Sequence, residues 1–172
     1  NGKMIRRHPH IFGDVKVKNS KEVHKNWEEI KMKEKGTADK PRESLLDGAP
    51  KSMPSLLYAR RLQERAATVG FDWEDIDGIY DKIDEEFDEV KEAIKKGDKE
   101  KILDEIGDLL FAVVNISRWL NLNPEEALRK TSKKFTKRFQ YIEKTARENN
   151  KTLSDMDIDE MEAIWQKAKT QI

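Results

Sequence analysis

Two groups of charged residues with the same spacing are the best candidates for chemistry in this sequence. Each group has a lysine, an acid four residues later and a second acid three residues after that. The groups are Lys82/Glu86/Glu89 and Lys101/Glu105/Asp108. Residues at this spacing share one face of an α-helix. If the two helices are antiparallel neighbours, four carboxylates converge.

Four close carboxylates repel one another unless a cation lies between them. Oxygen ligands without His or Cys favour Mg²⁺, Mn²⁺ or Ca²⁺, and Mg²⁺ usually accompanies a phosphate substrate. Glu85 and Asp104 lie beside the groups and are candidate general bases. A di-iron bundle needs Glu-x-x-His on its helices. His8, His10 and His24 lie outside the expected bundle, which argues against iron.

A second interpretation of the acidic faces stays open. In a chain that is 40% charged, such faces arise by chance and are usually solvated. Lys82 and Lys101 could form simple ion pairs with Glu86 and Glu105, or they could contact phosphates. Judged on the residues alone, a metal site and a solvated face are about equally supported. The alternative function is a non-catalytic helical dimerisation module whose acidic face binds a basic partner.

Basic and aromatic residues in the last third of the chain suit a polyanionic ligand. Lys134 and Arg138 are four residues apart, as are Trp165 and Lys169. Basic groups bind phosphates and a tryptophan can stack on a base. Taken singly, each pair is more typical of a surface pair or a core aromatic.

Hydrophobic periodicity predicts an all-α protein without strands. The expected helices cover about 53–69, 76–96, 99–120, 124–149 and a last one after Asp157. Gly70, Gly97–Asp98 and Pro124 separate them. Short connections between them predict a helical bundle over 53–172.

Several side chains have expected places in this bundle. The stripes expected to face inward are Ile79, Ile83, Phe87, Val90 and Ile94, then Ile102, Ile106, Leu109, Leu110, Val113 and Ser117. Phe71 and Trp73 are expected to plug one end of the bundle. Asn115 and Arg118 could contact a base or merely bridge helices.

Composition narrows the function classes. The 172 residues carry 34 charges of each sign, so bulk attraction to DNA, RNA or a membrane is not indicated. No apolar run approaches the ~20 residues of a transmembrane helix. The absence of cysteine fits a reducing cytoplasm. With only 36% apolar residues, thin helices that complete their core by association are expected.

The first part of the chain is expected to hold the end of a helix at Lys3–Arg7 and a loop over 8–14. A second helix is expected from Asn19 or Ser20 to about Lys35, with Val23, Trp27 and Ile30 on its apolar face. A linker rich in Gly, Pro and small polar residues follows over 37–52.

The acidic motif resembles the signature of the MazG nucleoside triphosphate pyrophosphohydrolases. The residues concerned are Glu85-Glu86-x-x-Glu89 and Glu105-x-x-Asp108, with Val69–Trp73, Asp104–Phe111, Lys134-Phe135-x-x-Arg138-Phe139 and Glu162-x-x-Trp165-x-x-x-Lys169. The resemblance implies an all-alpha fold of the MazG type, completed by dimerisation. It also implies hydrolysis of NTPs or dNTPs, ATP among them, at the α–β phosphate bond to a monophosphate and pyrophosphate.

The resemblance implies roles for individual residues. It implies Mg²⁺, or Mn²⁺, bound by Glu86, Glu89, Glu105 and Asp108. The implied nucleotide contacts are Lys82, Glu85, Lys101, Asp104, Lys134, Arg138, Trp165 and Lys169. Asp104 stands where a glutamate is expected. A member tuned to one nucleotide such as dUTP, or a silent regulator, is a further possibility.

The first 36 residues resemble part of a second copy of the domain. Arg6–Asp14 is similar to the two-domain bacterial members, and Lys3–Arg7 corresponds to Lys134–Arg138. The resemblance therefore implies the C-terminal helices of an upstream repeat at 1–36, a linker at 37–52 and a complete catalytic domain at 53–172.

Overall fold

The computed structural model describes residues 44–171 continuously, together with Ile5, residues 8–13 and the single positions 15, 17, 23, 26 and 30. The elements are α2 (Pro9–Phe12), η1 (Leu45–Gly48), α4 (Ser55–Ala67), α5 (Asp77–Lys96), α6 (Lys99–Trp119), α7 (Pro124–Glu148), η2 (Leu153–Asp155) and α8 (Ile158–Gln171). These described residues are all-α, and they contain no strand. The all-α prediction is confirmed. None of the described helices is long and apolar enough to cross a membrane.

The chain divides into two compact units, Asn1–Pro124 and Glu125–Ile172. The first contains η1, α4, α5 and α6, and the second contains most of α7 together with α8. The predicted division at residues 36 and 52 stays a prediction. The helix expected at Lys3–Arg7 and the one from Asn19 to Lys35 lie largely outside the described residues. The loop expected over 8–14 is wrong in part, because α2 forms a single helical turn there beginning at Pro9.

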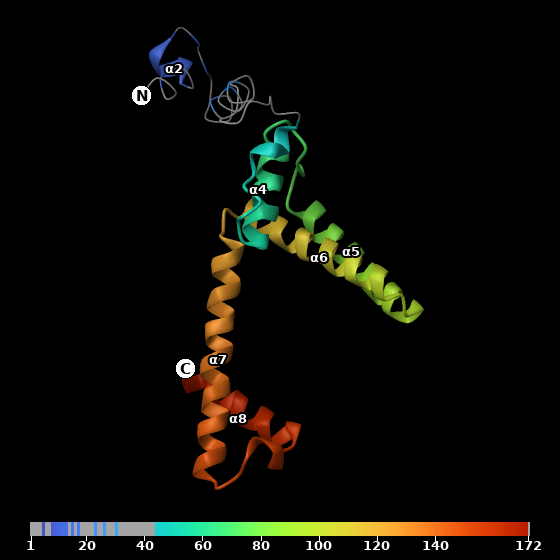
Figure 1. The fold of residues 1–172 in the computed structure, drawn as a ribbon, viewed down its shortest axis with the longest axis vertical. Helices are drawn as coiled ribbons and strands as arrows, with labels where there is room; N and C mark the ends of the chain where they lie inside the picture. Colours follow the sequence, from blue (N-terminus) through green and yellow to red (C-terminus); the bar gives the residue numbers. More distant parts are fainter. Residues whose placement is uncertain are drawn as a thin grey trace. The chain divides into compact units, whose positions relative to one another are not determined.

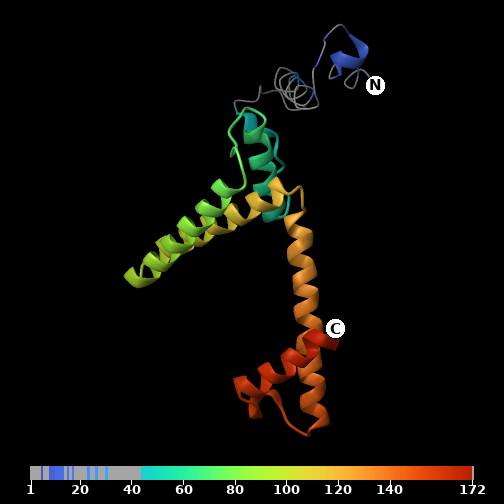
Figure 2. The same cartoon turned by 180° about the vertical axis from the view of Figure 1, so that it is seen from behind.

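Local sequence explains where the helices of the first unit begin and end. Gly97 adopts a left-handed conformation with φ of 70°, which ends α5. The Asp98 carboxylate then accepts hydrogen bonds from the backbone N–H groups of Glu100 and Lys101 and caps α6. This two-residue turn reverses the chain, so α5 and α6 lie side by side and antiparallel, as Figures 1 and 2 show.

The buried apolar residues of the α5–α6 hairpin come from both of its helices. Ile79, Val90 and Ala93 from α5 are buried, as are Ala112 and Val114 from α6. The helix α4 packs against the C-terminal part of α6, away from the Gly97 turn (Figure 1). The hairpin of α5 and α6 therefore has one packed face and one that other elements of this unit leave open.

Part of the predicted inward stripe is wrong for this chain. Phe87 and Ile94 of α5 are 50% and 58% exposed, and Ile106, Leu110 and Val113 of α6 are 41–52% exposed. The physical reason is that α5 and α6 contact each other through other faces of the two helices, which do not include these residues. The stripe instead leaves an exposed apolar face on the hairpin.

The second unit is a pair of helices. The last helix, α8, lies beside the C-terminal half of α7 in both views (Figures 1 and 2). Asp157 caps α8 by accepting a hydrogen bond from the Glu160 N–H, as expected. Ile142 and Ala146 from α7 and Ala168 from α8 are the buried apolar residues of this unit.

A buried arginine fixes η1 to α4 within the stretch expected to be a linker. Arg65 is 1% exposed and donates a 2.6 Å hydrogen bond from Nη1 to the Leu45 carbonyl oxygen. Its guanidinium lies directly against Gly48: a Cβ added there would come within 2.3 Å of Nη2. Within the linker expected over 37–52, Leu45–Gly48 therefore form a helical turn that is bonded to α4.

We expect Gly48→Ala to lower the free energy of unfolding by about 1–3 kcal/mol, the usual effect of overpacking. The buried guanidinium of Arg65 has little room to withdraw from the new methyl group. Urea unfolding of Gly48→Ala, Arg65→Met and the double variant measures this effect and its origin. The double variant should be more stable than the sum of the two losses implies, because methionine removes the clash. Strict additivity would contradict this account.

Candidate metal and nucleotide site

The turn at Gly97 sets the register that brings the acids together. Glu89 and Glu105 lie the same number of residues before and after Gly97, and so do Glu86 and Asp108. In an antiparallel hairpin, such residues lie opposite each other. Glu86, Glu105 and Asp108 each place a carboxylate oxygen within 4.8 Å of the others. Three of the four carboxylates that were predicted to converge therefore lie close together.

Two of these acids are buried in the contact between the helices. The side chains of Glu86 and Glu105 are only 6% and 10% exposed, whereas Asp108 lies at the exposed edge. Among the described residues, the Oε2 atom of Glu86 is buried without a hydrogen-bond partner. Buried charge is costly unless it is compensated. The three acids could therefore hold a cation that compensates this charge.

The fourth acid, Glu89, interacts directly with Glu105. A hydrogen bond from one carboxyl group to the other, and the negative charge of Glu105, raise the pKa of Glu89 above its ordinary value. The charges of Glu86 and Glu85 act in the same direction. A pKa raised in this way is typical of carboxyl groups that lie close to one another.

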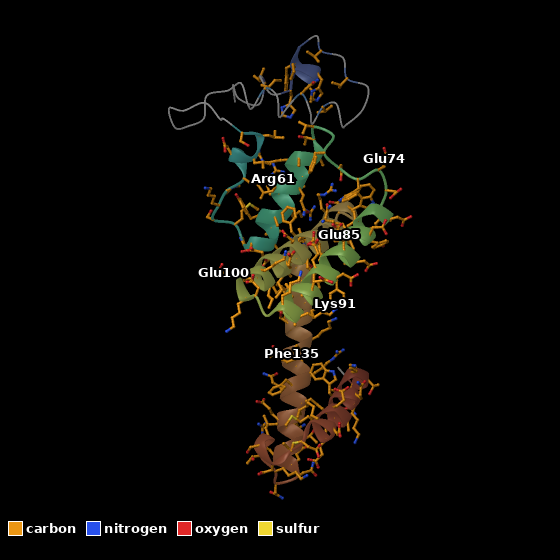
Figure 3. All side chains as sticks on the ribbon, turned by 90° about the vertical axis from the view of Figure 1, so that its right-hand side faces the viewer. Arg61, Glu74, Glu85, Lys91, Glu100 and Phe135 are labelled. Atoms are coloured by element: carbon orange, nitrogen blue, oxygen red, sulfur yellow. The ribbon has the colours of Figure 1, made fainter. Side chains whose placement is uncertain are left out.

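Both predicted lysines contact the acids. Lys82 Nζ lies 2.7 Å from Glu86 Oε1 and 3.1 Å from Glu85 Oε1, and these hydrogen bonds raise the pKa of Lys82. Lys101 Nζ lies 3.4 Å from Glu105 Oε1. Figure 3 shows Glu85 on α5 beside α6, where it is more than half exposed. Asp104 is exposed on α6.

A pocket of about 620 Å³ adjoins the acids. Lys82, Glu86 and Asp108 lie at one part of its wall. The remaining wall comes from η1, α4, the α4–α5 connection and α6, and is made of Leu46, Leu62, Gln63, Ala66, Gly70, Phe71, Asp72, Trp73, Phe111, Ala112, Asn115 and Arg118. The expectation that Phe71 plugs a bundle end is wrong, because Phe71 is 82% exposed and lines this pocket.

Sequence reasoning missed the α4 side of this pocket. Gln63 is buried and donates a 2.8 Å hydrogen bond to the Phe111 carbonyl oxygen, which joins α4 to α6. Leu46 comes from the stretch expected to be a linker. The apolar Leu45–Leu46 pair was the one available signal, and it does not indicate which helix it meets.

The remaining predicted nucleotide contacts all lie in the second unit. Arg138 lies over the Trp165 ring at 5.6 Å from its centroid, and Phe135 packs on the same ring at 5.4 Å. Figure 3 shows Phe135 on α7. Lys134 and Lys169 are exposed. That these four residues bind the same ligand as the acids of the first unit stays a prediction.

The fold and the acids define an all-α domain with a carboxylate cluster suited to a divalent cation. Residues 76–142, which cover α5, α6 and most of α7, match the MazG nucleotide pyrophosphohydrolase domain. This part of the chain is thus similar to the MazG domain.

Individual relatives are similar over nearly the whole chain. The nucleoside triphosphate pyrophosphohydrolase/pyrophosphatase MazG of Thermotoga maritima is 44% identical over 169 residues, which are 98% of this chain and 62% of the relative. The nucleoside triphosphate pyrophosphohydrolase of Escherichia coli K12 is 42% identical over 171 residues, 98% of this chain and 64% of the relative. An uncharacterized protein of Bacillus subtilis, YabN, is 48% identical over 168 residues, 97% of this chain and 34% of the relative. The chain spans under two thirds of the length of each.

We expect Glu89→Gln to stabilise the metal-free protein at neutral pH. The glutamine removes a carboxylate that the neighbouring Glu105 disfavours. Because the folded-state pKa of Glu89 is raised, ionised Glu89 weakens the fold above that pKa, and the penalty is relieved as the pH falls through it. The urea midpoint of unfolding, measured in EDTA, should therefore be higher for Glu89→Gln than for the wild type at pH 7. The two midpoints should converge in acid. A difference that persists undiminished in acid would contradict this account.

Proposed function

We propose that the chain hydrolyses nucleoside triphosphates at the α–β phosphate bond, giving a monophosphate and pyrophosphate, with Mg²⁺ as its cofactor. The observation that carries the proposal is the cluster of Glu86, Glu105 and Asp108 within a MazG domain. The named activity of the relatives from T. maritima and E. coli supports it.

The ligand atoms of the cluster suit magnesium. All are carboxylate oxygens, the hard donors that Mg²⁺ and Mn²⁺ prefer. The unpartnered Oε2 of Glu86 gives an independent reason for a cation, since a bound ion would compensate a buried charge. We propose Glu86, Glu89, Glu105 and Asp108 as the ligands, with Mn²⁺ as the substitute ion.

The chain's own residues then have distinct tasks. Bound Mg²⁺ would lower the pKa of a coordinated water and neutralise charge on the leaving pyrophosphate. Lys82 and Lys101, at the edge of the cluster, are placed to donate hydrogen bonds to phosphate oxygens. Glu85 or Asp104 is the proposed general base for the attacking water, and Lys82 Nζ lies 3.1 Å from Glu85 Oε1.

The pocket beside the acids supplies a place for the nucleoside. Its volume lies within the usual range for small-molecule sites. The acids and Lys82 lie at one part of its wall, and aromatic and aliphatic side chains such as Phe111 and Trp73 lie elsewhere around it. A nucleotide bound with its phosphates at the acids would place its base against these side chains. Lys134, Arg138, Trp165 and Lys169 are the further proposed nucleotide contacts.

We expect Glu86→Gln and Asp108→Asn to lose about 100-fold or more of the Mg²⁺-dependent pyrophosphate release, because each removes a metal ligand without changing side-chain size. The assay uses a panel of NTPs and dNTPs with Mg²⁺ and detects pyrophosphate and monophosphate. Asp88→Asn is the matched control: it neutralises an exposed acid on α5 that pairs with Lys91 at 2.7 Å. Undiminished activity in both ligand variants would rule out the assignment. A wild-type protein that cleaves no member of the panel would favour the non-catalytic module.

We further propose that two copies of the chain associate through the exposed apolar face of the α5–α6 hairpin. Phe87 and Ile94 from α5 and Ile106, Leu110 and Val113 from α6 form this face. Exposed apolar side chains on two adjacent helices are typical of a bundle completed by a partner. A second copy fits because the bundle then gains an equivalent hairpin.

We expect Leu110→Glu to convert a dimer to a monomer, because a charge in the middle of an apolar interface is costly to bury. Sedimentation equilibrium at micromolar concentration measures the mass of each variant. Leu122→Glu is the control, since Leu122 is similarly exposed at 55% but lies beyond the end of α6. A wild-type protein that is monomeric throughout, or a dimeric Leu110→Glu, would contradict this interface.

A further inference from the structure

The connection between α4 and α5 forms one wall of the pocket although little covers it. Phe71 and Trp73 from this connection line the pocket and are 82% and 43% exposed. Gly70 begins the connection with φ of 89°. The Trp73 ring lies on the backbone of α5, where a Cβ added at Gly78 would come within 2.5 Å of it. Something must hold this segment in place beside α6.

Arg118 of α6 holds this segment in place. Its Nη1 donates a 3.0 Å hydrogen bond to Asp72 Oδ2, and its Nη2 donates to Asp72 Oδ1. Paired hydrogen bonds between a guanidinium and a carboxylate fix geometry more firmly than a single contact. The Arg118 side chain is 10% exposed and that of Asp72 is 28% exposed, so the pair is partly shielded from water. Asp72 lies between the two aromatic residues of the pocket wall.

The same guanidinium also orients Asn115. Arg118 Nε donates a 2.8 Å hydrogen bond to Asn115 Oδ1. A guanidinium N–H can only donate, so the amide oxygen must face Arg118 and the amide nitrogen must point elsewhere. Asn115 lines the pocket. Its NH₂ group is therefore available to donate a hydrogen bond to a ligand there.

We propose that Arg118 is a positioning residue that shapes the nucleoside pocket. It holds the Phe71–Trp73 wall through Asp72, and it orients the Asn115 amide as a donor to an acceptor atom on the base or ribose. This inference rests on the proposed function, because it concerns the binding of the same substrate. Arg118 itself need not touch the phosphates or the metal. Its loss should weaken nucleoside binding and leave the phosphate chemistry intact.

The test compares KM with kcat for ATP and Mg²⁺. In Arg118→Met we expect KM to rise about tenfold while kcat stays within about twofold, which is the size expected for losing a charged hydrogen-bond pair. Inhibition by pyrophosphate, which lacks a nucleoside, should keep its wild-type constant. An unchanged KM would overturn the proposal. So would a fall in kcat at constant KM, or equal weakening of ATP and pyrophosphate.

Further variants separate the two contacts of Arg118. Asp72→Asn weakens the ion pair with little change of shape and should raise KM in the same direction. Asn115→Asp keeps an oxygen facing Arg118 but removes the amide donor, so it should raise KM although the pair with Asp72 stays. Glu92→Gln is the matched control, since it breaks an exposed 3.5 Å ion pair with Lys96 outside the pocket. These substitutions also decide the question if Arg118→Met does not fold, and wild-type KM values in both Asp72→Asn and Asn115→Asp would overturn the proposal.

Calorimetric binding of α,β-methylene ATP distinguishes failure of this inference from failure of the proposed hydrolysis. If the wild type binds this analogue and cleaves no nucleotide, the proposed function fails, and weaker binding to Arg118→Met still supports the positioning role. If the wild type cleaves ATP and Arg118→Met binds the analogue as tightly, the positioning role fails and the proposed function stands.

Discussion

Glu86 and Glu105 lie in the contact between α5 and α6, at positions where a helix pair ordinarily places apolar residues. Lys82 and Lys101 compensate this charge in part, through one oxygen of each acid. Glu89 and Asp108 bring further negative charge to the same place. Such an arrangement weakens the fold by itself, and natural chains accept that cost mainly where function requires it. The rest of the first unit can be understood as the scaffold that holds these acids together.

The scaffold is simple because one turn sets most of it. The left-handed Gly97 and the Asp98 cap reverse the chain within two residues and fix the register of α5 against α6. That register places acids opposite acids in the middle of the hairpin. It also places the exposed apolar side chains, such as Phe87 and Leu110, on a different face of the same two helices. The carboxylate cluster and the exposed apolar face are therefore consequences of one local structure.

Much of this arrangement could be read from the sequence because its signals are local. Gly70, Gly97 and Pro124 mark where helices end or begin, and each expected helix of the bundle lies within a few residues of its observed position. The spacing of Lys, acid and acid was enough to predict the convergence, since helical periodicity fixes which side chains share a face.

The errors concern long-range packing. Periodicity indicates that Phe87 and Ile94 share a face, but it does not indicate whether this chain covers that face. The pocket requires α4 to cross α6, with Gln63 bonded to a carbonyl oxygen of α6, and no spacing in the sequence encodes that contact. The bond between Asp72 and Arg118 joins residues 46 positions apart, so neither could be assigned a partner in advance.

The most direct test of the account is whether the buried acids bind a divalent cation. Electron paramagnetic resonance of Mn²⁺, titrated into the full chain with α,β-methylene ATP present, measures free and bound ion without relying on turnover. We expect saturable Mn²⁺ binding that Mg²⁺ displaces and that Glu105→Gln weakens strongly. Binding that is absent, or that is the same in Glu105→Gln, would show that the cluster does not hold a divalent cation and would contradict the account.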